Sequence, residues 1–504
     1  MGEPNTSLPA LKSDGITVDT FSGRIHVEWD PTAAVTPLGQ MAFFIDFLKT
    51  GGLYEPWVAD CPLHYTSPNA PKKPNVLGTV LLSVLSGHHR YSHITSVRCD
   101  NVNPGLLGMT TVVSEDSVRK ALRQIEKTQG AHWLKEHMRR CYEALLAMPW
   151  IMDGDTTVKP LYGKQEGAVV GYNPQKPGRP SHTYHSYLMA NTRLVLDVEV
   201  QAGNKTATCY STPGLWELLN SIPRRHWPAF FRGDSAWGND AFMSQAEAEG
   251  LLYLVKLRLT KNVRKLIEKT FRQNGWRQAG QGWEGIEEEL QLMGWKNKRR
   301  VIVLRRALKG DVAISEKRKG QIEFGFVEID GTAKKYEYAV LATTLKDEVL
   351  TIAQHYRDRA DAENNFDELK NQWGWGGYTT KDLKRCGFMA RIVALIYNWW
   401  SLFVRLAHPD KHLEAITSRP LLLHAVAKQT RHQSQTTVTI TSTHAKTEKI
   451  QNTLNQIASF LQRLRETAEQ LTQTDRWRLI LSRAFVKLLG GRSLHAPALL
   501  PLRV

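Results

Sequence analysis

The spacing of apolar and polar positions separates helical from extended stretches of the chain. Residues 1–33 alternate with a period of two, which predicts a short strand or hairpin, and the pattern turns helical after residue 36. One apolar helix is predicted over 74–85, and another begins at Ser114, a good N-terminal cap. The apolar stripe of this second helix consists of Val118, Ala121, Leu122 and Ile125. Residues 1–147 are therefore predicted to form a mostly helical region.

The other faces of this second helix are basic, with Arg119, Lys120, Arg123 and Lys127. Short helices with such a surface could form a helix-turn-helix reader of DNA. A helical scaffold with a solvated basic face explains the same pattern equally well. The pattern alone leaves both interpretations open.

From residue 148 the pattern changes to that of a mixed α/β layer. A strand is predicted over 150–159, and strands over 184–190 and 194–200 continue it as an antiparallel meander. Strands then alternate with helices. We therefore predict the first part of an α/β core, a mixed sheet flanked by helices, over 148–258.

The segment 259–334 has the pattern of a mainly β insertion. Its predicted strands cover 282–292, 299–306 and 321–329. Asp330 and Gly331 predict a hairpin turn after the last of these strands. The core is expected to resume over 335–408, where the apolar run 392–407 is too short and too polar for a membrane span and predicts a buried helix.

The C-terminal region, 409–504, is basic. It carries 14 Lys and Arg against 6 Asp and Glu, so +8 of the net charge of +17 lies there. A polar, threonine-rich linker or exposed hairpin is predicted over 429–446, with helices over 450–469 and 477–489. Apolar stripes with a basic remainder suit dimer contacts and DNA binding, and a plain helical appendage is an equal alternative.

The overall charge narrows the class of partner. The 504 residues include 66 Lys and Arg against 49 Asp and Glu, a surplus that suits nucleic acid or an anionic membrane. Five cysteines without a C-x-x-C motif indicate a reducing cytosol. We therefore expect a cytoplasmic protein that binds nucleic acid and no membrane.

Acidic residues on two predicted strands are candidates for metal chemistry. Asp153 and Asp155 face the same side of one strand, and aspartate is disfavoured in strands unless a metal or a terminus accounts for it. Asp234 ends the strand that begins at Pro228, at the edge where open α/β sheets place their sites. A turn former or helix cap is the commoner role for such an aspartate.

A helix predicted over 348–373 carries the third acid. Tyr356, Glu363 and Lys370 follow each other at intervals of seven residues and share one stripe. Arg359 precedes Glu363 by four residues and falls on the same face. A solvated face with ion pairs four residues apart explains this spacing about as well.

Taken together, these motifs resemble the DDE transposases of bacterial insertion sequences. The resemblance covers about residues 148–405 and is closest to the branch with a Y-R-E-K signature, most like insertion-sequence family thirteen-eighty. The motifs are Asp-Thr-Thr at 155–157, Gly-Asp at 233–234, the run from Gln165 to His182, and Tyr356-x2-Arg359-x3-Glu363-x6-Lys370. The resemblance implies an RNase H-like catalytic core interrupted by a β insertion, between helical N- and C-terminal regions.

The resemblance also implies a reaction. A homodimer in a synaptic complex would bind terminal inverted repeats of double-stranded DNA, cleave them and join them to target DNA in the bacterial nucleoid. Asp155, Asp234 and Glu363 would be the catalytic acids and the ligands of two Mg²⁺ ions, for which Mn²⁺ would substitute. Asp155 is preferred over Asp153 because it begins the Asp-Thr-Thr triplet. The alternatives are a nuclease without strand transfer and a domesticated DNA-binding protein without catalysis.

Further residues are expected to contact DNA. The resemblance assigns phosphate contacts to three residues of the predicted helix, Tyr356, Arg359 and Lys370. Lys164 and Arg179 lie on the glycine- and proline-rich loop after the first strand. Trp295 and Trp373 are candidates for stacking on a flipped base, and a place in the core explains such tryptophans as well.

Overall fold

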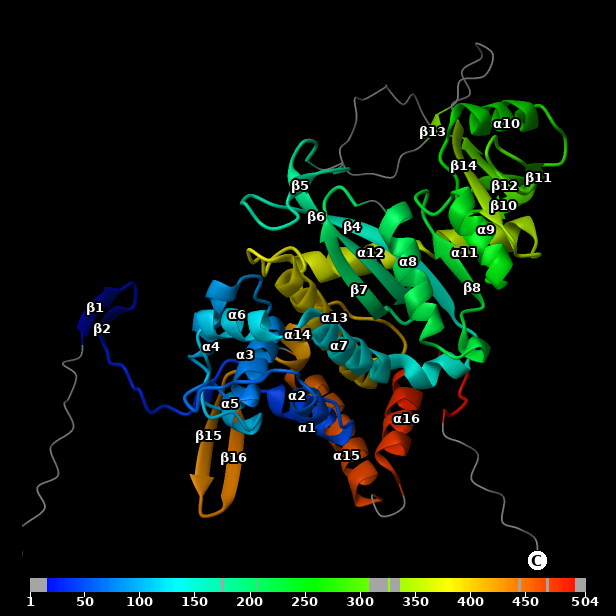
Figure 1. The fold of residues 1–504 in the computed structure, drawn as a ribbon. Helices are drawn as coiled ribbons and strands as arrows, with labels where there is room; N and C mark the ends of the chain where they lie inside the picture. Colours follow the sequence, from blue (N-terminus) through cyan, green and yellow to red (C-terminus); the bar gives the residue numbers. More distant parts are fainter. Residues whose placement is uncertain are drawn as a thin grey trace, which may run out of the picture.

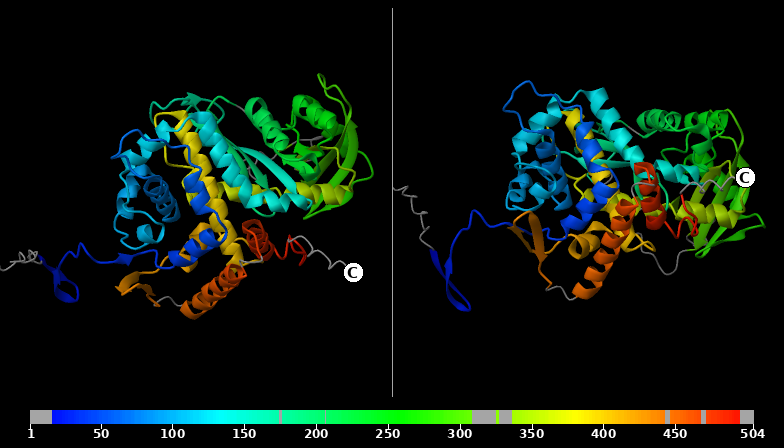
Figure 2. Two further views of the ribbon diagram at one scale, coloured as in Figure 1. Left: turned by 60° about the horizontal axis from the view of Figure 1, so that its bottom comes forward. Right: turned by 90° about the horizontal axis from the view of Figure 1, so that it is seen from below.

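The computed structural model describes residues 16–173, 176–205, 207–307, 325–326, 336–442, 446–467 and 471–494. A large mixed sheet with helices on both faces forms its centre, and the predicted α/β class is confirmed (Figure 1). Figure 1 shows α8 in front of the strands and α12 behind them. The termini of the described chain lie outside this central layer (Figure 2).

The central sheet has 11 strands among the described residues, in the order β10-β11-β12-β14-β9-β8-β4-β6-β5, with β13 beside β14 and β7 beside β6. The strands are β4 (Ile151–Pro160), β5 (Val169–Val170), β6 (Pro180–Met189), β7 (Leu194–Ala202), β8 (Phe230–Gly233), β9 (Tyr253–Lys256), β10 (Arg277–Gly280), β11 (Trp283–Leu290), β12 (Arg299–Ala307), β13 (Gly325–Phe326) and β14 (Tyr336–Thr343).

Strand β4 lies at the junction between two kinds of pairing. It pairs antiparallel with β6, which pairs antiparallel with β7, so the predicted meander is confirmed. On its other side β4 is parallel to β8, and β8 is parallel to β9. The carboxyl ends of β8 and β9 therefore lie side by side, next to the middle of β4, where the parallel pairing of β4 stops at Gly154.

The strands of the predicted insertion continue this same sheet. Strand β12 pairs with β14, and β14 pairs antiparallel with β9 of the core, so hydrogen bonding runs without a gap from core to insertion. A helix, α10 (Lys261–Phe271), accompanies these strands and was not predicted; Val263, Leu266, Ile267 and Thr270 form its buried face. The predicted turn at Asp330 and Gly331 lies outside the described residues.

Helices surround the sheet and join the two ends of the chain. They are α1 (Met41–Thr50), α2 (Tyr54–Ala59), α3 (Lys73–Leu85), α4 (Ile94–Val97), α5 (Asn103–Leu106), α6 (Glu115–Gln124), α7 (Lys127–Tyr142), α8 (Ala207–Asn220), α9 (Asp240–Glu249), α10, α11 (Val349–Arg357), α12 (Ala360–Asn371), α13 (Leu383–Ala407), α14 (Ala415–Leu422), α15 (Thr447–Glu466) and α16 (Gln473–Ala484). The predicted mostly helical N-terminal segment is thus seen, and Ser114 caps α6 by accepting from the Ser117 N–H.

Helix α13 is the axis of the helical part. It packs on β7 and α7, and it also contacts α1, α3, α15 and α16, so N- and C-terminal helices meet around it (Figure 2). Among the described residues α13 is the single helix long and apolar enough to cross a membrane, and 94% of its most apolar window is buried within the protein. That burial is typical of a core helix, as the sequence predicted.

Two hairpins project from the body. The N-terminal one pairs β1 (Ile16–Thr20) with β2 (Gly23–Val27), and the other pairs β15 (Ala427–His432) with β16 (Gln435–Ile440). The second hairpin is attached through β3 (Val35–Thr36), which pairs with the start of β15. The hairpin predicted as one of two possibilities for the polar segment 429–446 is therefore present.

Candidate active site

Asp155 and Asp234 occupy neighbouring positions just beyond the point where the parallel pairing of β4 with β8 ends. The last pair in register between β4 and β8 is Gly154 with Gly233, and each aspartate is the next residue along the chain. Adjacent strands lie about 4.8 Å apart, so the two carboxylates share one small region. Both glycines are needed because a Cβ atom on either would lie 3.0 Å or less from the Trp237 ring.

A lysine at the end of the third parallel strand, β9, lies next to this pair of aspartates. Val255 of β9 is in register with Gly233, which places Lys256 beside Asp234. Burial lowers the pKa of Lys256, whereas the charges of Asp234 and Glu363 raise it, so both acids lie within electrostatic reach. Sequence reasoning missed Lys256, although a buried strand that ends in lysine was the available signal.

The helix predicted over 348–373 is divided into α11 and α12, so the prediction of one uninterrupted helix was wrong. In a continuous α-helix the His355 carbonyl would accept from the Arg359 N–H. Here the His355 carbonyl accepts a 2.6 Å hydrogen bond from the Arg232 guanidinium. The Arg359 N–H instead donates to the Tyr356 carbonyl at 3.2 Å. This tightened turn delivers the Arg359 side chain toward the strand ends.

Arg359 connects two of the predicted acids. Its guanidinium donates to Asp155 at 2.6 Å and to Glu363 at 3.2 Å. The side chain of Arg359 is 5% exposed and that of Asp155 15%, whereas that of Glu363 is 46% exposed. Burial raises the pKa of Asp155 to about 6 against the opposing effect of Arg359, and Asp234 and Glu363 raise it further. The charges of Asp234 and Glu363 therefore both reach the carboxyl group of Asp155.

The two ends of the predicted stripe also face this region. Burial raises the pKa of Tyr356, on which Arg359, Asp234, Glu363 and Asp155 all act. Burial lowers the pKa of Lys370, and the nearby charge of Asp155 opposes that shift. Tyr356 and Lys370 thus approach the acids from the two helices on either side of the tightened turn.

The carboxylates of Asp155, Asp234 and Glu363 suit a hard divalent cation, but in this structure they do not form a complete set of ligands around one point. Carboxylate oxygens from three elements are the ligands that Mg²⁺ prefers. Within the described ranges no three His, Cys, Asp or Glu side chains gather as a metal-binding group. The Arg359 guanidinium, bound to Asp155 and Glu363, takes the place of a cation between them.

Asp153, the alternative to Asp155, is committed elsewhere. Both of its oxygens accept from Arg232, at 2.6 and 2.7 Å, and both side chains are 2% exposed. Such a buried bidentate pair leaves no oxygen free for a cation. The preference for Asp155 as the catalytic residue stays a prediction, and the role of Asp153 in this structure is an ion pair.

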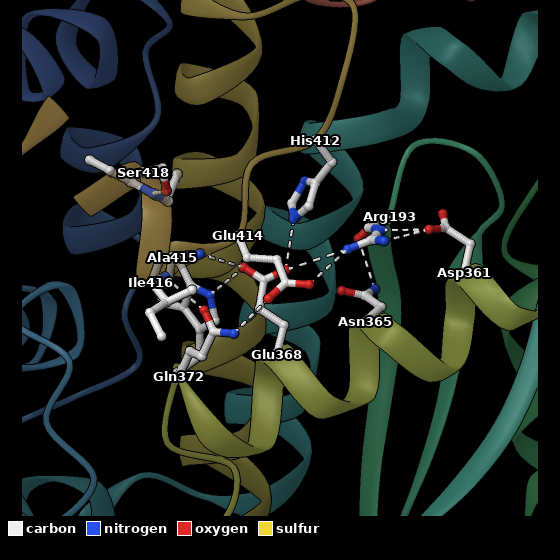
Figure 3. A network of polar contacts seen from close by, with 12 residues as sticks. Arg193, Asp361, Asn365, Glu368, Gln372, His412, Glu414, Ala415, Ile416 and Ser418 are labelled. Atoms are coloured by element: carbon white, nitrogen blue, oxygen red, sulfur yellow. Dashed lines mark hydrogen bonds and ion pairs between the residues drawn. The ribbon is translucent and has the colours of Figure 1, made fainter. Parts of the chain in front are cut away.

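A buried polar network fixes the helix that carries Glu363 (Figure 3). Glu368 of α12 is 1% exposed and accepts from the Trp373 indole at 3.1 Å, the Ala415 N–H at 3.0 Å and the His412 ring at 2.7 Å. Arg193, after β6, binds Asp361, which precedes Glu368 by about two turns on the same helix. Helix α12 is thus tied both to the sheet and to the segment that begins the C-terminal region.

The loop after β4 presents cations as predicted. Lys164 and Arg179 are both exposed. The Arg179 guanidinium lies 4.8 Å from the centroid of the Tyr162 ring, and Lys176 lies 5.1 Å from it. Tyr162 is 68% exposed, so this group forms a basic, aromatic surface on an exposed loop.

The two predicted stacking tryptophans differ in their surroundings. Trp373 is 0% exposed, and the Arg419 guanidinium lies 4.0 Å from its ring centroid. With its indole N–H bound to Glu368, it is a core residue that cannot receive a base, which corrects the prediction for this residue. Trp295 is half-buried in the turn between β11 and β12, where Arg299 covers its ring at 5.0 Å.

One comparison with known proteins places the chain in a family. No curated protein matches the chain. Among solved structures, the piggyBac transposase synaptic complex with hairpin DNA is similar over 88% of this chain and 85% of that one, with 11% identity and a TM-score of 0.41. The family described as "Transposase DDE domain group 1" matches residues 103–463, more than half of the chain. The chain therefore belongs to the family Transposase DDE domain group 1.

Proposed function

We propose that the protein is a DNA transposase that binds the terminal inverted repeats of its element, cleaves them and joins them to target DNA. The observation that carries this proposal is the proximity of Asp155 and Asp234 on neighbouring strands β4 and β8, together with the bonds from Arg359 to Asp155 and Glu363. Three carboxylates from separate elements are the ligand set that divalent-metal phosphoryl transfer requires. The family supports the same reaction class.

The core is proposed to be RNase H-like. Its strands follow the order β7-β6-β4-β8-β9, an antiparallel meander continued by two parallel strands. The spacing of Tyr356, Arg359, Glu363 and Lys370 supports membership of the Y-R-E-K branch of bacterial insertion sequences, most like insertion-sequence family thirteen-eighty. We place the protein in the bacterial cytoplasm, acting on the nucleoid as a homodimer that holds two DNA ends.

Asp155, Asp234 and Glu363 would hold two Mg²⁺ ions, or Mn²⁺ in their place. When bound, such ions activate water or a 3′-hydroxyl as nucleophile and stabilise negative charge at the phosphate. Arg359 and Lys370 carry positive charge on the same face and would bind the flanking phosphates, with Tyr356 donating its hydroxyl. Lys164 and Arg179 would contact the DNA backbone from their exposed loop, and Trp295 remains a candidate for base stacking.

A strand-transfer assay tests the proposal. Labelled duplexes that carry the ends of the element are incubated with target plasmid and MgCl₂, using the wild-type chain and the variants Asp155→Asn, Asp234→Asn and Glu363→Gln. Joined products are expected for the wild-type chain alone, while all four proteins bind the duplex. The exposed pair on α12, Asp367 with Asn371, supplies the control Asp367→Asn, which should keep activity.

The alternatives predict different products. Cleaved but unjoined ends from the wild-type chain would identify a nuclease without strand transfer. Binding without cleavage in either metal would identify a domesticated DNA-binding protein. Full strand transfer by Glu363→Gln would remove Glu363 from the site and overturn the assignment of the third acid.

A further inference from the structure

The β15–β16 hairpin has a composition unlike that of the rest of the surface. The chain contains no Asp or Glu between Glu414 and Glu448, a stretch that includes the whole hairpin. Both of its faces carry hydrogen-bonding side chains, because Lys428 pairs with Thr439, Thr430 with Thr437, Arg431 with Thr436 and His432 with Gln435 in register. The hairpin therefore offers donors and acceptors on two sides.

The outer half of the β15–β16 hairpin does not pack against the other described parts of the protein. The side chains from Thr430 to Thr437 are exposed, whereas Ala427 at the base is 1% exposed and packs against the body near Gly39. Figure 1 shows the hairpin extending away from the helical part. An exposed ribbon without apolar residues at its tip needs no protein partner to cover it.

The charges on the ribbon favour a polyanion. No carboxylate in the described part of the chain forms an ion pair with Arg431, which lies near the tip. Lys428 nearer the base lies within electrostatic reach of Asp30, so its charge is partly countered. The net contribution of the ribbon is positive and is largest where it projects furthest.

The N-terminal hairpin provides a contrast within the same chain. On β1–β2 an ion pair at 2.9 Å joins Arg24 to Asp19, and one face presents the exposed apolar residues Ile16, Val18 and Ile25. An exposed apolar face of this kind is typical of surfaces that contact other proteins. The β15–β16 ribbon lacks both its acids and its apolar face, so it fits another class of partner.

We propose that the β15–β16 ribbon enters the major groove of double-stranded DNA. The major groove accepts a two-stranded ribbon, whose strands lie about 4.8 Å apart, and six residues per strand reach roughly 20 Å. Arg431 is positioned to bind phosphate or a guanine edge, and His432 and Gln435 form the adjoining polar pair. The inference rests on the proposed function and adds to it a DNA-contacting element.

The experiment measures equilibrium DNA binding by fluorescence anisotropy across a salt titration, without divalent cations. The probes are a fluorescein-labelled duplex with the terminal sequence of the element and a scrambled duplex of the same length. The proteins are the wild-type chain, Arg431→Gln, the double variant Lys428→Gln with Arg431→Gln, and the matched control Lys346→Gln. Lys346 is exposed and is followed by Asp347 and Glu348, so its loss removes the same charge from a surface that does not suit DNA.

Arg431→Gln is expected to weaken binding to the terminal duplex roughly tenfold. The slope of log affinity against log salt should fall by about 0.9 for each phosphate contact that is lost. Protection of guanine N7 from dimethyl sulfate, which reports on the major groove, should disappear over one short tract. Lys346→Gln should behave as the wild-type chain does, and all variants should keep the thermal midpoint.

The outcomes separate this inference from the proposed function. In one outcome, the wild-type chain carries out strand transfer while the double variant keeps the affinity and the salt slope of the wild-type chain. That result overturns the proposal that the β15–β16 ribbon binds DNA and leaves the proposed transposase function standing. If the variants reduce the slope of log affinity against log salt but leave the guanine protection unchanged, the ribbon contacts only the DNA backbone. That result overturns the proposal that the ribbon enters the major groove. A wild-type chain that binds neither duplex overturns both proposals.

Discussion

The guanidinium of Arg359 lies between Asp155 and Glu363, 2.6 Å from an oxygen of one and 3.2 Å from an oxygen of the other. An internal cation thus neutralises two of the three acids proposed to bind metal. A divalent ion that takes both carboxylates must compete with this guanidinium for the same oxygens. The affinity of the site for metal and the position of Arg359 are therefore linked.

Replacing Arg359 by glutamine should make stability depend on metal. Removing one partner of a buried ion pair costs about 3–5 kcal/mol because the remaining charge is left uncompensated. We expect Arg359→Gln to unfold at a lower temperature than the wild-type chain without metal and to recover more on addition of MgCl₂. Differential scanning fluorimetry with and without MgCl₂ measures both shifts.

The neighbouring Arg357 supplies the control for that measurement. Its side chain donates to Gln354 at 2.9 Å and forms no ion pair within the described residues. Arg357→Gln should therefore show the small metal response of the wild-type chain. An equal response in Arg359→Gln would contradict the view that Arg359 substitutes for a cation.

Asp153 and Asp155 should separate stability from catalysis although they lie two residues apart. Asp153→Asn removes the charge that binds the buried Arg232, so it should lower the free energy of unfolding by about 3–5 kcal/mol. Asp155→Asn should retain more stability and lose strand transfer. Urea unfolding and the strand-transfer assay on the same preparations compare the two. The reverse order of effects would assign the catalytic role to Asp153.

Much of this site followed from local pattern in the sequence. The meander, the aspartate at the end of a buried strand and the seven-residue stripe are periodic or positional signals, and β4, β6, β7 and β8 lie close to where these signals placed them. The interruption between α11 and α12 could not be predicted, because its cause is a hydrogen bond to the His355 carbonyl from Arg232. The two residues are 123 positions apart along the chain, and the contact exists only once the sheet has formed.

The wrong prediction for Trp373 has the same cause, namely contacts between residues that are distant in sequence. Trp373 follows the helix that carries Glu363 in the sequence, and a place beside the DNA was therefore predicted for it. Its burial depends on Arg419 and on Tyr397 of α13, both distant in sequence. Lys256 was missed for the converse reason, since its value as a site residue depends on the register of β8 with β9.

Lys256→Gln should reduce catalysis more than it reduces DNA binding. The lysine lies beside Asp234 at the end of β9, where its charge would attract a phosphate held at the proposed catalytic acids. Loss of one such electrostatic contact is expected to slow strand transfer by roughly tenfold to a hundredfold. The rate with pre-bound ends measures the effect. Lys269→Gln on α10 is the control, since Lys269 is exposed and pairs at 3.3 Å with Glu288; equal slowing there would indicate a general charge effect.

Acid should destabilise the protein through His185. Burial lowers the pKa of His185 to about 4 from the ordinary value of 6.5. The unfolded chain therefore binds a proton between these values that the folded chain does not, so stability is full above pH 6.5 and is lost as the pH falls toward 4. The loss approaches roughly 3 kcal/mol at the acid end.

The variant His185→Gln should flatten that dependence. Thermal midpoints at pH 7.5 and pH 5 are compared for the wild-type chain, His185→Gln and His64→Gln, the last at an exposed position. The difference between the two pH values should shrink in His185→Gln alone. A dependence as steep as that of the wild-type chain would assign the acid sensitivity to other groups.

Glu368 should act on catalysis through the position of helix α12. Its carboxylate accepts three hydrogen bonds while 1% exposed, and one of the donors, the Ala415 N–H, belongs to the segment that begins the C-terminal region (Figure 3). Glu368→Ala leaves all three donors buried and unpaired, so it should lower the free energy of unfolding by several kcal/mol, at about 1–3 kcal/mol for each group. Glu363 would then lose its fixed place, and strand transfer should fall with little change in the affinity for DNA.

Glu368→Gln distinguishes positioning from mere loss of folding. The amide oxygen can still accept from the Trp373 indole and the Ala415 N–H, and its NH₂ can donate to His412 if that ring presents an unprotonated Nε2. We therefore expect Glu368→Gln to recover most of the stability and the rate that Glu368→Ala loses. Unfolding in urea and single-turnover strand transfer are measured on both. Equal loss of rate in both variants at restored stability would mean that the charge of Glu368, and not its hold on α12, serves the reaction.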